Sequence, residues 1–516
     1  MSDLSPTPET IPPAEASEEA SPEASTPPAP LVMQVSLDPA VVNALWRHPL
    51  LAPLKGEQKP SRKPRGTVDE CVWLDTAEGL LASRGYALEA PRKGARQLLC
   101  AMPGPGFAVP GTVPLPLAEL LADGVPDEAE GEVLLPIAAF TGRRTEADVG
   151  EVRLTLRHGQ LRCVAAEAPV ALMELSGPPE AVLDLAAGLA EDLPLLPAAA
   201  TLAETARALS RQEAPRPRRL GPPYLGDVET IESALALAIA HLTDVLLVQA
   251  PRARLEIGPE GVHQSRVAAR RLRSCLKQFR TVLDGLHLRA LDRQLADFAR
   301  ALGEARDLDV FLMNLGADLA DAAGPEEKRV AILLRTARQK RQHAYTHLRT
   351  MLESVEFRRL IWNATRLAAL RDWGAEQIID SHAPLRPFAR ATLARRWRKL
   401  LKRGNDIAEH EAESLHELRL DAKRLRYAAE LFAPLWSGKA TRRFLKRLAG
   451  VQDALGIAND THVARVLVAG LGGRGGAGPW AIGLGEGFAL ARGAGARSQA
   501  LEAWHALEKL EPFWED

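Results

Sequence analysis

The chain has 516 residues, of which 46% are hydrophobic and 25% are charged, so it is long enough for two or three domains with apolar cores. Its 65 Lys and Arg residues nearly balance 66 Asp and Glu residues, and the formal net charge of −1 argues against a general nucleic-acid binder. Its four cysteines lie far apart, without a C-x-x-C pair or a Cys/His cluster, which disfavours a disulfide framework and a structural zinc site.

Residues 1–30 contain six acids, eight prolines and no Lys or Arg. A segment of this composition cannot bury enough apolar surface to fold, so we expect a disordered tail. It lacks the basic and apolar regions of a signal peptide, and no stretch of the chain approaches 18 uninterrupted apolar residues. We therefore expect no membrane span and a cytoplasmic location.

Residues 31–212 alternate between short apolar segments and Gly/Pro turns, which predicts antiparallel strands. The strand candidates are VMQVSL, CVWLD, QLLCAM, VRLTLRHGQLRCVA and VALMELS. Two intervening segments, LDPAVVNALW and PPEAVLDLAAGLAEDL, predict helices, and the first has Asp38 as its cap and Pro39 in its first turn.

In the order of its motifs this region resembles the CYTH, or triphosphate tunnel, family. The resemblance rests on LDPAVVNALWRHPLLA, WLDT at Trp73–Thr76, VRLTLRHGQLR at Val152–Arg162 and MELSGPPEAVLDLA at Met173–Ala186. It implies an eight-stranded antiparallel β-barrel in which carboxylates hold Mg²⁺ or Mn²⁺ and Lys and Arg clamp a triphosphate.

Several residues that the resemblance requires are replaced. The E-x-E-x-K signature of the first strand falls on Met33–Ser36, which offers no carboxylate and no lysine. Glu89 and Pro91 stand where the resemblance expects alternating arginines. Arg157 replaces the aspartate of an expected Asp-x-Gly motif, and Leu202 replaces an expected lysine.

Of the acidic cluster of the family only Glu174 is kept, with Arg143, Arg144 and Arg153 as leftover phosphate contacts. A lone glutamate cannot hold a catalytic metal. We therefore expect a degenerate barrel without catalytic residues, metal site or cofactor, in which Mg²⁺ or Mn²⁺ would bind only if activity were retained.

The Pro- and Arg-rich segment at residues 213–226 predicts a linker into a helical domain at residues 227–516. With a shift of 153 residues this domain matches itself without a gap: VHQSRVAARRLRSCLKQF pairs with LHELRLDAKRLRYAAELF, and LGEARDLDV pairs with LGIANDTHV. A shared register of this length predicts two copies of one structural unit, at about residues 227–370 and 380–516.

The first copy carries basic residues at a 3-4-3-4 spacing, which places them on one stripe of a helix: His263, Arg266, Arg270, Arg273 and Lys277. Unpaired charges cannot fill a dry core, so the stripe must face acids, water or an anionic ligand. Because Arg forks suit phosphate oxygens and His gains charge below about pH 6.5, a phosphate-bearing ligand is favoured.

A plainer interpretation is that the stripe is a solvated face or pairs with acids of the following helix, namely Asp292, Asp297, Glu304 and Asp307. The repetition of the His-Arg pattern at a fixed shift argues against this interpretation. A further acid-free run at residues 386–403 adds Arg395, Arg398 and Lys402 at helical spacing.

The paired H-x-x-R-x-x-x-[RK]-R-L-R segments, the LG-x-x-[RN]-D stretches and the closing EAWHALEKLEPFW resemble the conserved histidine α-helical domain, CHAD, over about Asp227 to Trp514. The resemblance implies two four-helix bundles related by pseudo-twofold symmetry, with basic helices that bind inorganic polyphosphate. The binding residues it implies are His263, Arg266, Arg270, Arg273, Lys277, Arg395, Arg398, Lys402, His416, Arg419, Lys423 and Arg426. Lys277 falls on Glu430, so the second stripe is shorter and we expect the two halves to bind unequally.

Together these observations predict an α+β protein, with a degenerate CYTH-like antiparallel barrel followed by an all-α CHAD domain. We expect a non-enzymatic polyphosphate binder that associates with polyphosphate or storage granules in a bacterial cytoplasm. The alternative is a metal-dependent inorganic triphosphatase in which the CHAD domain binds substrate. RNA or DNA binding is disfavoured because the basic helices lack interleaved aromatic residues. The oligomeric state is left open.

Overall fold

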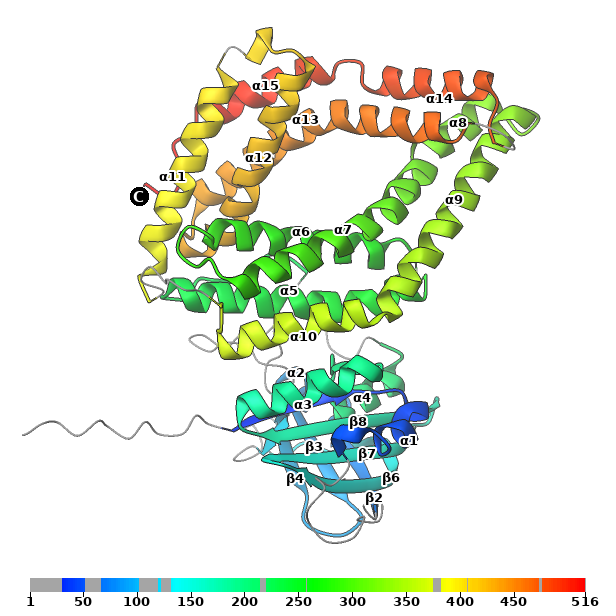
Figure 1. Ribbon diagram of the computed structural model, residues 1–516, viewed down its shortest axis with the longest axis vertical. Coiled ribbons are helices and arrows are strands. Elements are labelled where there is room, and N and C mark those ends of the chain that lie inside the picture. Colours follow the sequence, from blue (N-terminus) through cyan, green and yellow to red (C-terminus); the bar gives the residue numbers. More distant parts are fainter. Residues whose placement is uncertain are drawn as a thin grey trace, which may run out of the picture.

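The structure is a computed structural model that describes residues 30–51, 66–101, 119–121, 131–213, 220–256, 258–374, 382–405, 407–472 and 476–515. An antiparallel sheet with a few helices comes first, and a larger helical region follows (Figure 1). The predicted α+β class is therefore confirmed. Residues 1–29 of the predicted disordered tail and residues 214–219 of the predicted linker lie outside the described residues.

The described strands form one antiparallel sheet in the order β5-β4-β3-β2-β6-β7-β8-β1-β9. Their bounds are β1 Leu31–Ser36, β2 Thr67–Asp75, β3 Tyr86–Pro91, β4 Gln97–Ala101, β5 Glu119–Leu121, β6 Leu135–Val149, β7 Val152–Arg162, β8 Glu167–Gly177 and β9 Leu196–Pro197. All five predicted strand segments are strands. The tightly paired β3 and β6 were not predicted.

The sheet is open, so the predicted closed barrel is wrong for the part of the chain that is described. Its two edges are β5 and β9, and no pairing between them is present among these residues. β9 has two residues and ends at Pro197, which has no N–H to donate to a further strand. Closure needs edge strands that pair along their length, and these two are too short.

Four α-helices accompany the sheet in the described part of this region: α1 Val42–Leu45, α2 Leu80–Ser83, α3 Pro179–Asp192 and α4 Leu202–Arg211. The predicted helix after β1 is short, although Asp38 caps it by accepting a hydrogen bond from the Ala40 backbone N–H at 2.8 Å. Helix α3 forms as predicted and buries Val182 and Leu189 against β1 and β8.

The WLDT motif has a structural role. Asp75 is buried, and its carboxylate accepts hydrogen bonds from the backbone N–H groups of Leu81 at 2.9 Å and Ala82 at 3.1 Å. It thereby caps the start of α2, where the helix leaves N–H groups without partners.

Eleven described helices follow: α5 Ile231–Arg254, α6 Glu260–Phe279, α7 Leu286–Met313, α8 Leu315–Ala323, α9 Lys328–Glu353, α10 Val355–Leu370, α11 Leu385–Gly404, α12 Ala412–Phe432, α13 Lys439–Gly470, α14 Pro479–Arg492 and α15 Ala496–Glu508. Six belong to the first predicted copy and five to the second, more than two four-helix bundles contain. Helices α7 and α13 begin 153 residues apart, in agreement with the sequence repeat.

The two copies share one hydrophobic core. A single cluster of buried residues runs from α5 to the C-terminal Trp514. Phe279 at the end of α6 and Phe432 at the end of α12 are related by the repeat, and their rings contact each other with centroids 6.1 Å apart. Phe388 of α11 packs against both rings. This shared packing fixes α6 and α12 side by side.

Helix α5 is the one described helix that is long and apolar enough to cross a membrane. However, 89% of its most apolar window is buried within the protein, as the central helix of a core would be.

Helix α10 joins the helical region to the sheet (Figure 1). The Trp362 indole N–H donates a hydrogen bond to the Leu195 carbonyl at 3.0 Å, and its ring belongs to the buried cluster beneath α3. Arg366 pairs with Asp184 of α3 at 2.5 Å. The two parts therefore meet through apolar packing as well as ion pairs.

Candidate anion-binding site

Helix α6 has one apolar face and one basic face. Val262, Ala269, Leu272 and Leu276 are buried in the shared core. The basic stripe lies on the other side, as its 3-4 spacing predicted. The apolar face thus orients the cations away from the core without requiring them to be buried in it.

A cavity of about 1200 Å³ lies between α6, α7, α12, α13 and α14. Figure 1 labels these helices. Half of the predicted binding residues line the cavity: His263, Arg266, Arg270, Arg273, Arg419 and Lys423. The other six do not: Lys277, Arg395, Arg398, Lys402, His416 and Arg426. The cavity therefore unites the central parts of both stripes.

Three further cations line the cavity and were missed in the sequence: Arg300 and Arg306 of α7, and Arg492 of α14. Each lies in a segment that also holds acids, so no acid-free run marks it. Only Arg306 had a local signal, because it belongs to the repeated LG-x-x-[RN]-D motif.

The two copies contribute unequally. The first supplies six of the basic lining residues, on α6 and α7, whereas α12 supplies two and α14 one. This bias agrees in direction with the shorter second stripe predicted from the sequence.

Some of the stripe is paired with acids, as the plainer interpretation expected. Arg273 donates to Asp292 at 2.8 Å, and Arg266 lies 3.9 Å from Asp307. Four lining cations, however, form no ion pair among the described residues: Arg270, Arg306, Arg419 and Lys423. Local acids therefore compensate only part of the positive charge of the cavity.

The Arg419 guanidinium has an unmet hydrogen-bonding requirement. Its buried Nε has no acceptor among the described residues, and burial lowers the pKa of this side chain. A buried donor without a partner costs about 1–3 kcal/mol, so this Nε destabilises the folded protein.

Gly303 of α7 allows Arg266 to approach. A Cβ at this position would lie 2.6 Å from an Nη atom of Arg266. The glycine of the repeated motif thus leaves room for the guanidinium against the backbone of α7.

The cavity perturbs its titratable groups. Burial lowers the pKa of His263, with the charges of Arg306, Arg266 and Arg270 acting in the same direction and Glu260 opposing them. Burial raises the pKa of Asp307 despite the neighbouring arginines. Both shifts disfavour the charged form.

Two cations of helix α11 form ion pairs with a buried carboxylate of α12 and do not line the cavity. Lys399 and Arg403 of this helix, together with Arg424 of α12, surround the buried carboxylate of Asp421 at 2.7–3.1 Å. The predicted wall residues Arg395, Arg398 and Lys402 are exposed and lie outside the cavity.

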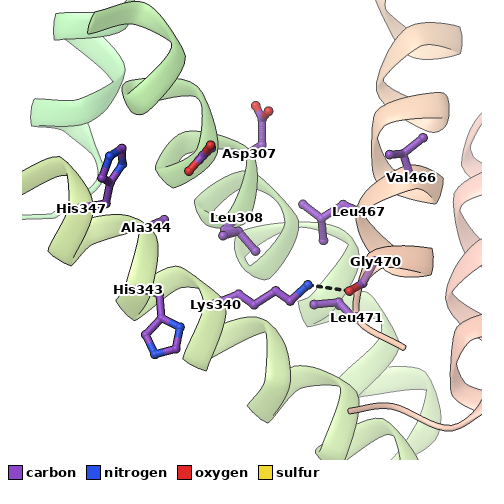
Figure 2. A pocket seen from close by; sticks show the side chains of 11 residues that line it. Asp307, Leu308, Lys340, His343, Ala344, His347, Val466, Leu467, Gly470 and Leu471 are labelled. Atoms are coloured by element: carbon purple, nitrogen blue, oxygen red, sulfur yellow. Dashed lines mark hydrogen bonds between the residues drawn. The ribbon is translucent and has the colours of Figure 1, made fainter. Parts of the chain in front are cut away.

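A second cavity, of about 530 Å³, lies between α7, α9 and α13. Asp307 and Leu467 line both cavities. Lys340 donates a hydrogen bond to the Gly470 carbonyl at 2.5 Å, while His343 and His347 lie along α9 (Figure 2). The one lysine that lines this second cavity is thus bonded to the end of α13. The remaining charged and titratable lining residues are Glu304, Asp307, His343 and His347, which do not form a cationic surface.

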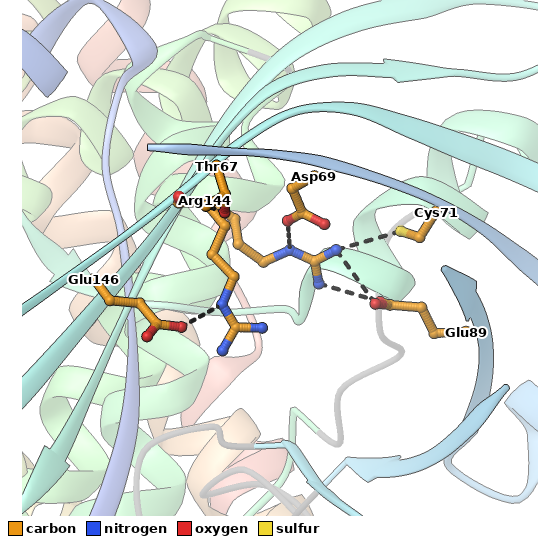
Figure 3. Close-up of polar contacts among 7 residues, drawn as sticks. Thr67, Asp69, Cys71, Glu89, Arg144 and Glu146 are labelled. Atoms are coloured by element: carbon orange, nitrogen blue, oxygen red, sulfur yellow. Dashed lines mark hydrogen bonds and ion pairs between the residues drawn. The ribbon is translucent and has the colours of Figure 1, made fainter. Parts of the chain in front are cut away.

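In the sheet, Arg157 of β7 is the centre of a buried polar cluster. Its partners Asp69, Cys71 and Glu89 are labelled in Figure 3. Arg157 donates to Asp69 at 2.8 Å, to Glu89 at 3.1 Å and to the Cys71 sulfur at 3.3 Å. Burial by itself lowers the pKa of Arg157, but Glu89, Cys71 and Asp69 raise it above its ordinary value. Both carboxylates and the thiol thus have the same guanidinium as their partner within the sheet.

The other remnants predicted in the sheet also have local partners. Glu174 accepts a hydrogen bond from Gln34, which stands opposite it in the register of β1 and β8. Arg143 donates to the Gly66 carbonyl, Arg144 pairs with Glu146, and Arg153 pairs with Asp148.

These features define a class: an α+β protein whose helical region repeats one unit around a basic cavity. Residues 237–469 match the family model of the CHAD domain. The helical region thus contains a CHAD domain, as its repeated motifs indicated. The CYTH-like identity of residues 31–212 stays a prediction.

Two curated relatives come from Mycobacterium tuberculosis. The uncharacterized protein Rv2226 of strain ATCC 25618 / H37Rv is 33% identical over 182 residues, and the uncharacterized protein MT2285 of strain CDC 1551 / Oshkosh is 31% identical over 173 residues. Each match covers 33% of this chain and 34% of the relative, so only about a third of either relative is matched.

Two solved structures are also similar. The CHAD domain from the plant Ricinus communis is 29% identical, with 55% of this chain and 93% of that chain covered and a TM-score of 0.46. PptA from Streptomyces chartreusis is 19% identical, with 54% and 99% covered and a TM-score of 0.42.

Proposed function

We propose that this protein is a non-enzymatic binder of inorganic polyphosphate and that the cavity between α6 and α12 is the binding site. The observation that carries the proposal is the meeting of both basic stripes in one cavity. Eight Arg or Lys side chains and one His line it, against two Asp. A chain of phosphates would neutralise this surplus and release counterions, so binding should weaken steeply as salt rises.

The unpaired cations support a phosphate ligand in particular. Arg270 and Lys423 occupy equivalent positions of the two copies and form no ion pair within 4 Å among the described residues, and the charge of Arg270 acts on Asp307 from a longer distance. Arg419 also lines the cavity and forms no ion pair within 4 Å among the described residues. We assign the main contacts with the ligand to these three residues. Because α6 and α7 supply more basic residues than α12 and α14, we assign the larger share of the affinity to that side of the cavity.

For the sheet we propose a CYTH-like origin with loss of catalysis. The Arg157 and Glu89 positions are those at which the family resemblance expects charges of the opposite sign, and here the two residues pair with each other. A compensated ion pair leaves neither side chain available for a metal or a triphosphate. In this proposal the protein acts in a bacterial cytoplasm, where the CHAD domain directs it to polyphosphate or storage granules.

The test is a titration of the full chain with long-chain polyphosphate at two salt concentrations. The Arg270→Ala/Arg419→Ala/Lys423→Ala variant should lose at least about 100-fold in affinity, given roughly 1.5–3 kcal/mol for each charged contact. The matched control is Arg395→Ala/Arg398→Ala/Lys402→Ala, which removes the same number of cations outside the cavity and should change affinity less than about threefold.

Phosphate release from tripolyphosphate is recorded in parallel with Mg²⁺ and with Mn²⁺. Equal loss in the two triple variants would reject the cavity as the site and favour a diffuse surface interaction. Metal-dependent phosphate release would reject the non-enzymatic assignment and favour the triphosphatase alternative.

A further inference from the structure

The lining of the central cavity changes character along α7 and α13. Towards α6 and α12 it is basic. Beyond Asp307 on α7 and Asp460 on α13 it becomes mainly apolar, with Val310, Phe311 and Leu315 on one side, and Val463, Ala464 and Leu467 on the other. The polar residues of this part are Asn314, Thr461 and Arg492, and Arg492 is paired with Asp318 at 2.6 Å. The change occurs within one helical turn on each helix.

The repeat relates residues of the apolar part of the lining to each other, as it does in the basic part. Val310 and Val463 occupy equivalent positions, each three residues beyond the equivalent aspartates. Their exposed fractions are nearly equal, at 37% and 38%, and both line the cavity. Two copies of the unit thus present the same apolar side chain to the same space.

This wall is firmly packed from behind. Phe311, Leu315 and Ala489 of the lining are almost fully buried and belong to a cluster that joins α7, α8, α9, α13 and α14. Inorganic polyphosphate has no group that gains from such a wall, because all of its oxygens require polar partners or water. A ligand that uses the whole lining must carry an apolar part beside its anionic part.

We propose that the cavity binds amphiphilic phosphates, in which a phosphate or diphosphate group is joined to an alkyl or prenyl chain. The head group lies between Arg270 and Lys423, and the chain lies along Val310 and Val463 towards α14. The inference rests on the proposed anion site for its head group and adds an apolar subsite to it. A cavity of about 1200 Å³ is large enough for both parts.

The experiment is a titration of the full chain with butyl, hexyl and octyl phosphate below their micellar concentrations, alongside tripolyphosphate. Each methylene buried on the apolar wall should tighten binding by about fourfold, the equivalent of about 0.8 kcal/mol. The Val310→Ser/Val463→Ser variant should flatten this chain-length series and leave tripolyphosphate affinity unchanged. Leu490→Ser, at an exposed leucine of α14 outside the lining, is the matched control and should keep the series.

The outcomes separate this inference from the proposed function. Tight tripolyphosphate binding with no dependence on alkyl length overturns the amphiphile site and leaves the polyphosphate site standing. A chain-length series without tripolyphosphate binding supports the amphiphile site and rejects polyphosphate as the ligand. If sedimentation shows that the double Val variant dissociates an oligomer, the wall is an interface between copies and the inference is overturned.

Discussion

Glu430 of α12 stands at the position that Lys277 holds on α6, and its carboxylate joins the two helices. It accepts a hydrogen bond from Arg426 Nε on its own helix at 2.7 Å and from Arg271 Nη2 on α6 at 3.2 Å. The substitution that shortens the second basic stripe therefore has a structural use. It ties the two halves of the repeat together at the end of the stripe.

The Glu430→Gln variant should lower the free energy of unfolding by about 1–2 kcal/mol, because two largely buried guanidinium groups lose their charged acceptor. Urea denaturation measures the change. Glu502→Gln, at an exposed glutamate of α15, is the control and should be neutral. Unchanged stability of Glu430→Gln would mean that water replaces the carboxylate without cost.

The salt dependence of polyphosphate affinity should identify which cations touch the ligand. Arg270→Ala should reduce the slope of log Kd against log salt by about one unit. Lys277→Ala removes a cation from the same stripe of α6, but outside the cavity, and should leave the slope unchanged. Titrations at four salt concentrations give both slopes. A reduced slope for Lys277→Ala would extend the contact surface beyond the cavity.

The stripes illustrate what the sequence could and could not predict. Helical spacing and the repeat sufficed to place His263 and Arg419 on equivalent faces, because periodicity is a local property. Which turns of the stripe face the cavity depends on how α6 crosses α7 and α12. That crossing is a tertiary feature. Spacing alone therefore could not show that Arg270 lines the cavity whereas Lys277 and His416 do not.

The sheet shows the same limit in another form. Each predicted strand formed, but closure into a barrel depends on the length of the edge strands, which periodicity does not report. Helix α4 was missed although Thr201 and Glu204 form a capping box, with the Glu204 N–H donating to Thr201 Oγ1 at 3.1 Å. The T-x-x-E pattern was a readable signal.

Polyphosphate affinity should rise as pH falls, because of His263. Burial and Arg306 hold its pKa below the ordinary value in the free protein, which favours the neutral imidazole. A bound polyanion favours the imidazolium and raises this pKa, so binding takes up a proton between the two pKa values. Asp307, whose raised pKa lets it lose charge at higher pH than usual, acts in the same direction.

The measurement is Kd from pH 5 to pH 8 at constant ionic strength. His263→Gln should flatten the His-dependent part of the profile. His343→Gln, on the exposed face of α9, should keep the profile of the unaltered protein. An unchanged profile in His263→Gln would assign the pH dependence to Asp307 or to the ligand.

The contact between α10 and the sheet depends on Trp362. Its replacement by Ala should cost about 3–5 kcal/mol, since a buried ring and the hydrogen bond of its indole N–H to Leu195 are both lost. Calorimetry should then show the sheet part unfolding separately, at a lower temperature. Trp480→Ala is the control, because that ring is 45% exposed and should cost less than about 1 kcal/mol. A single unchanged transition in Trp362→Ala would show that the ion pairs alone hold the two parts together.

Burial makes Cys71 unreactive in the native protein, although Arg157 lowers the pKa of its thiol. Burial raises the pKa of the Cys71 thiol to about 12, with Glu89 adding to the rise. Because the thiolate is the nucleophile, alkylation at pH 8 should be very slow at Cys71 and faster at the half-buried Cys163. In Arg157→Leu, Asp69 and Glu89 keep their charges without a partner, which should destabilise the sheet by about 3–5 kcal/mol.

Local opening of the sheet in that variant should expose Cys71 to alkylation, which mass spectrometry of the labelled peptides can follow. Arg153→Leu removes an exposed arginine of the same strand and should leave Cys71 protected. If Cys71 stays protected in Arg157→Leu as well, the apolar packing around Trp73 and Phe140 holds this part of the sheet without the ion pairs. The ion pairs of Arg157 would then have no part in keeping this part of the sheet closed.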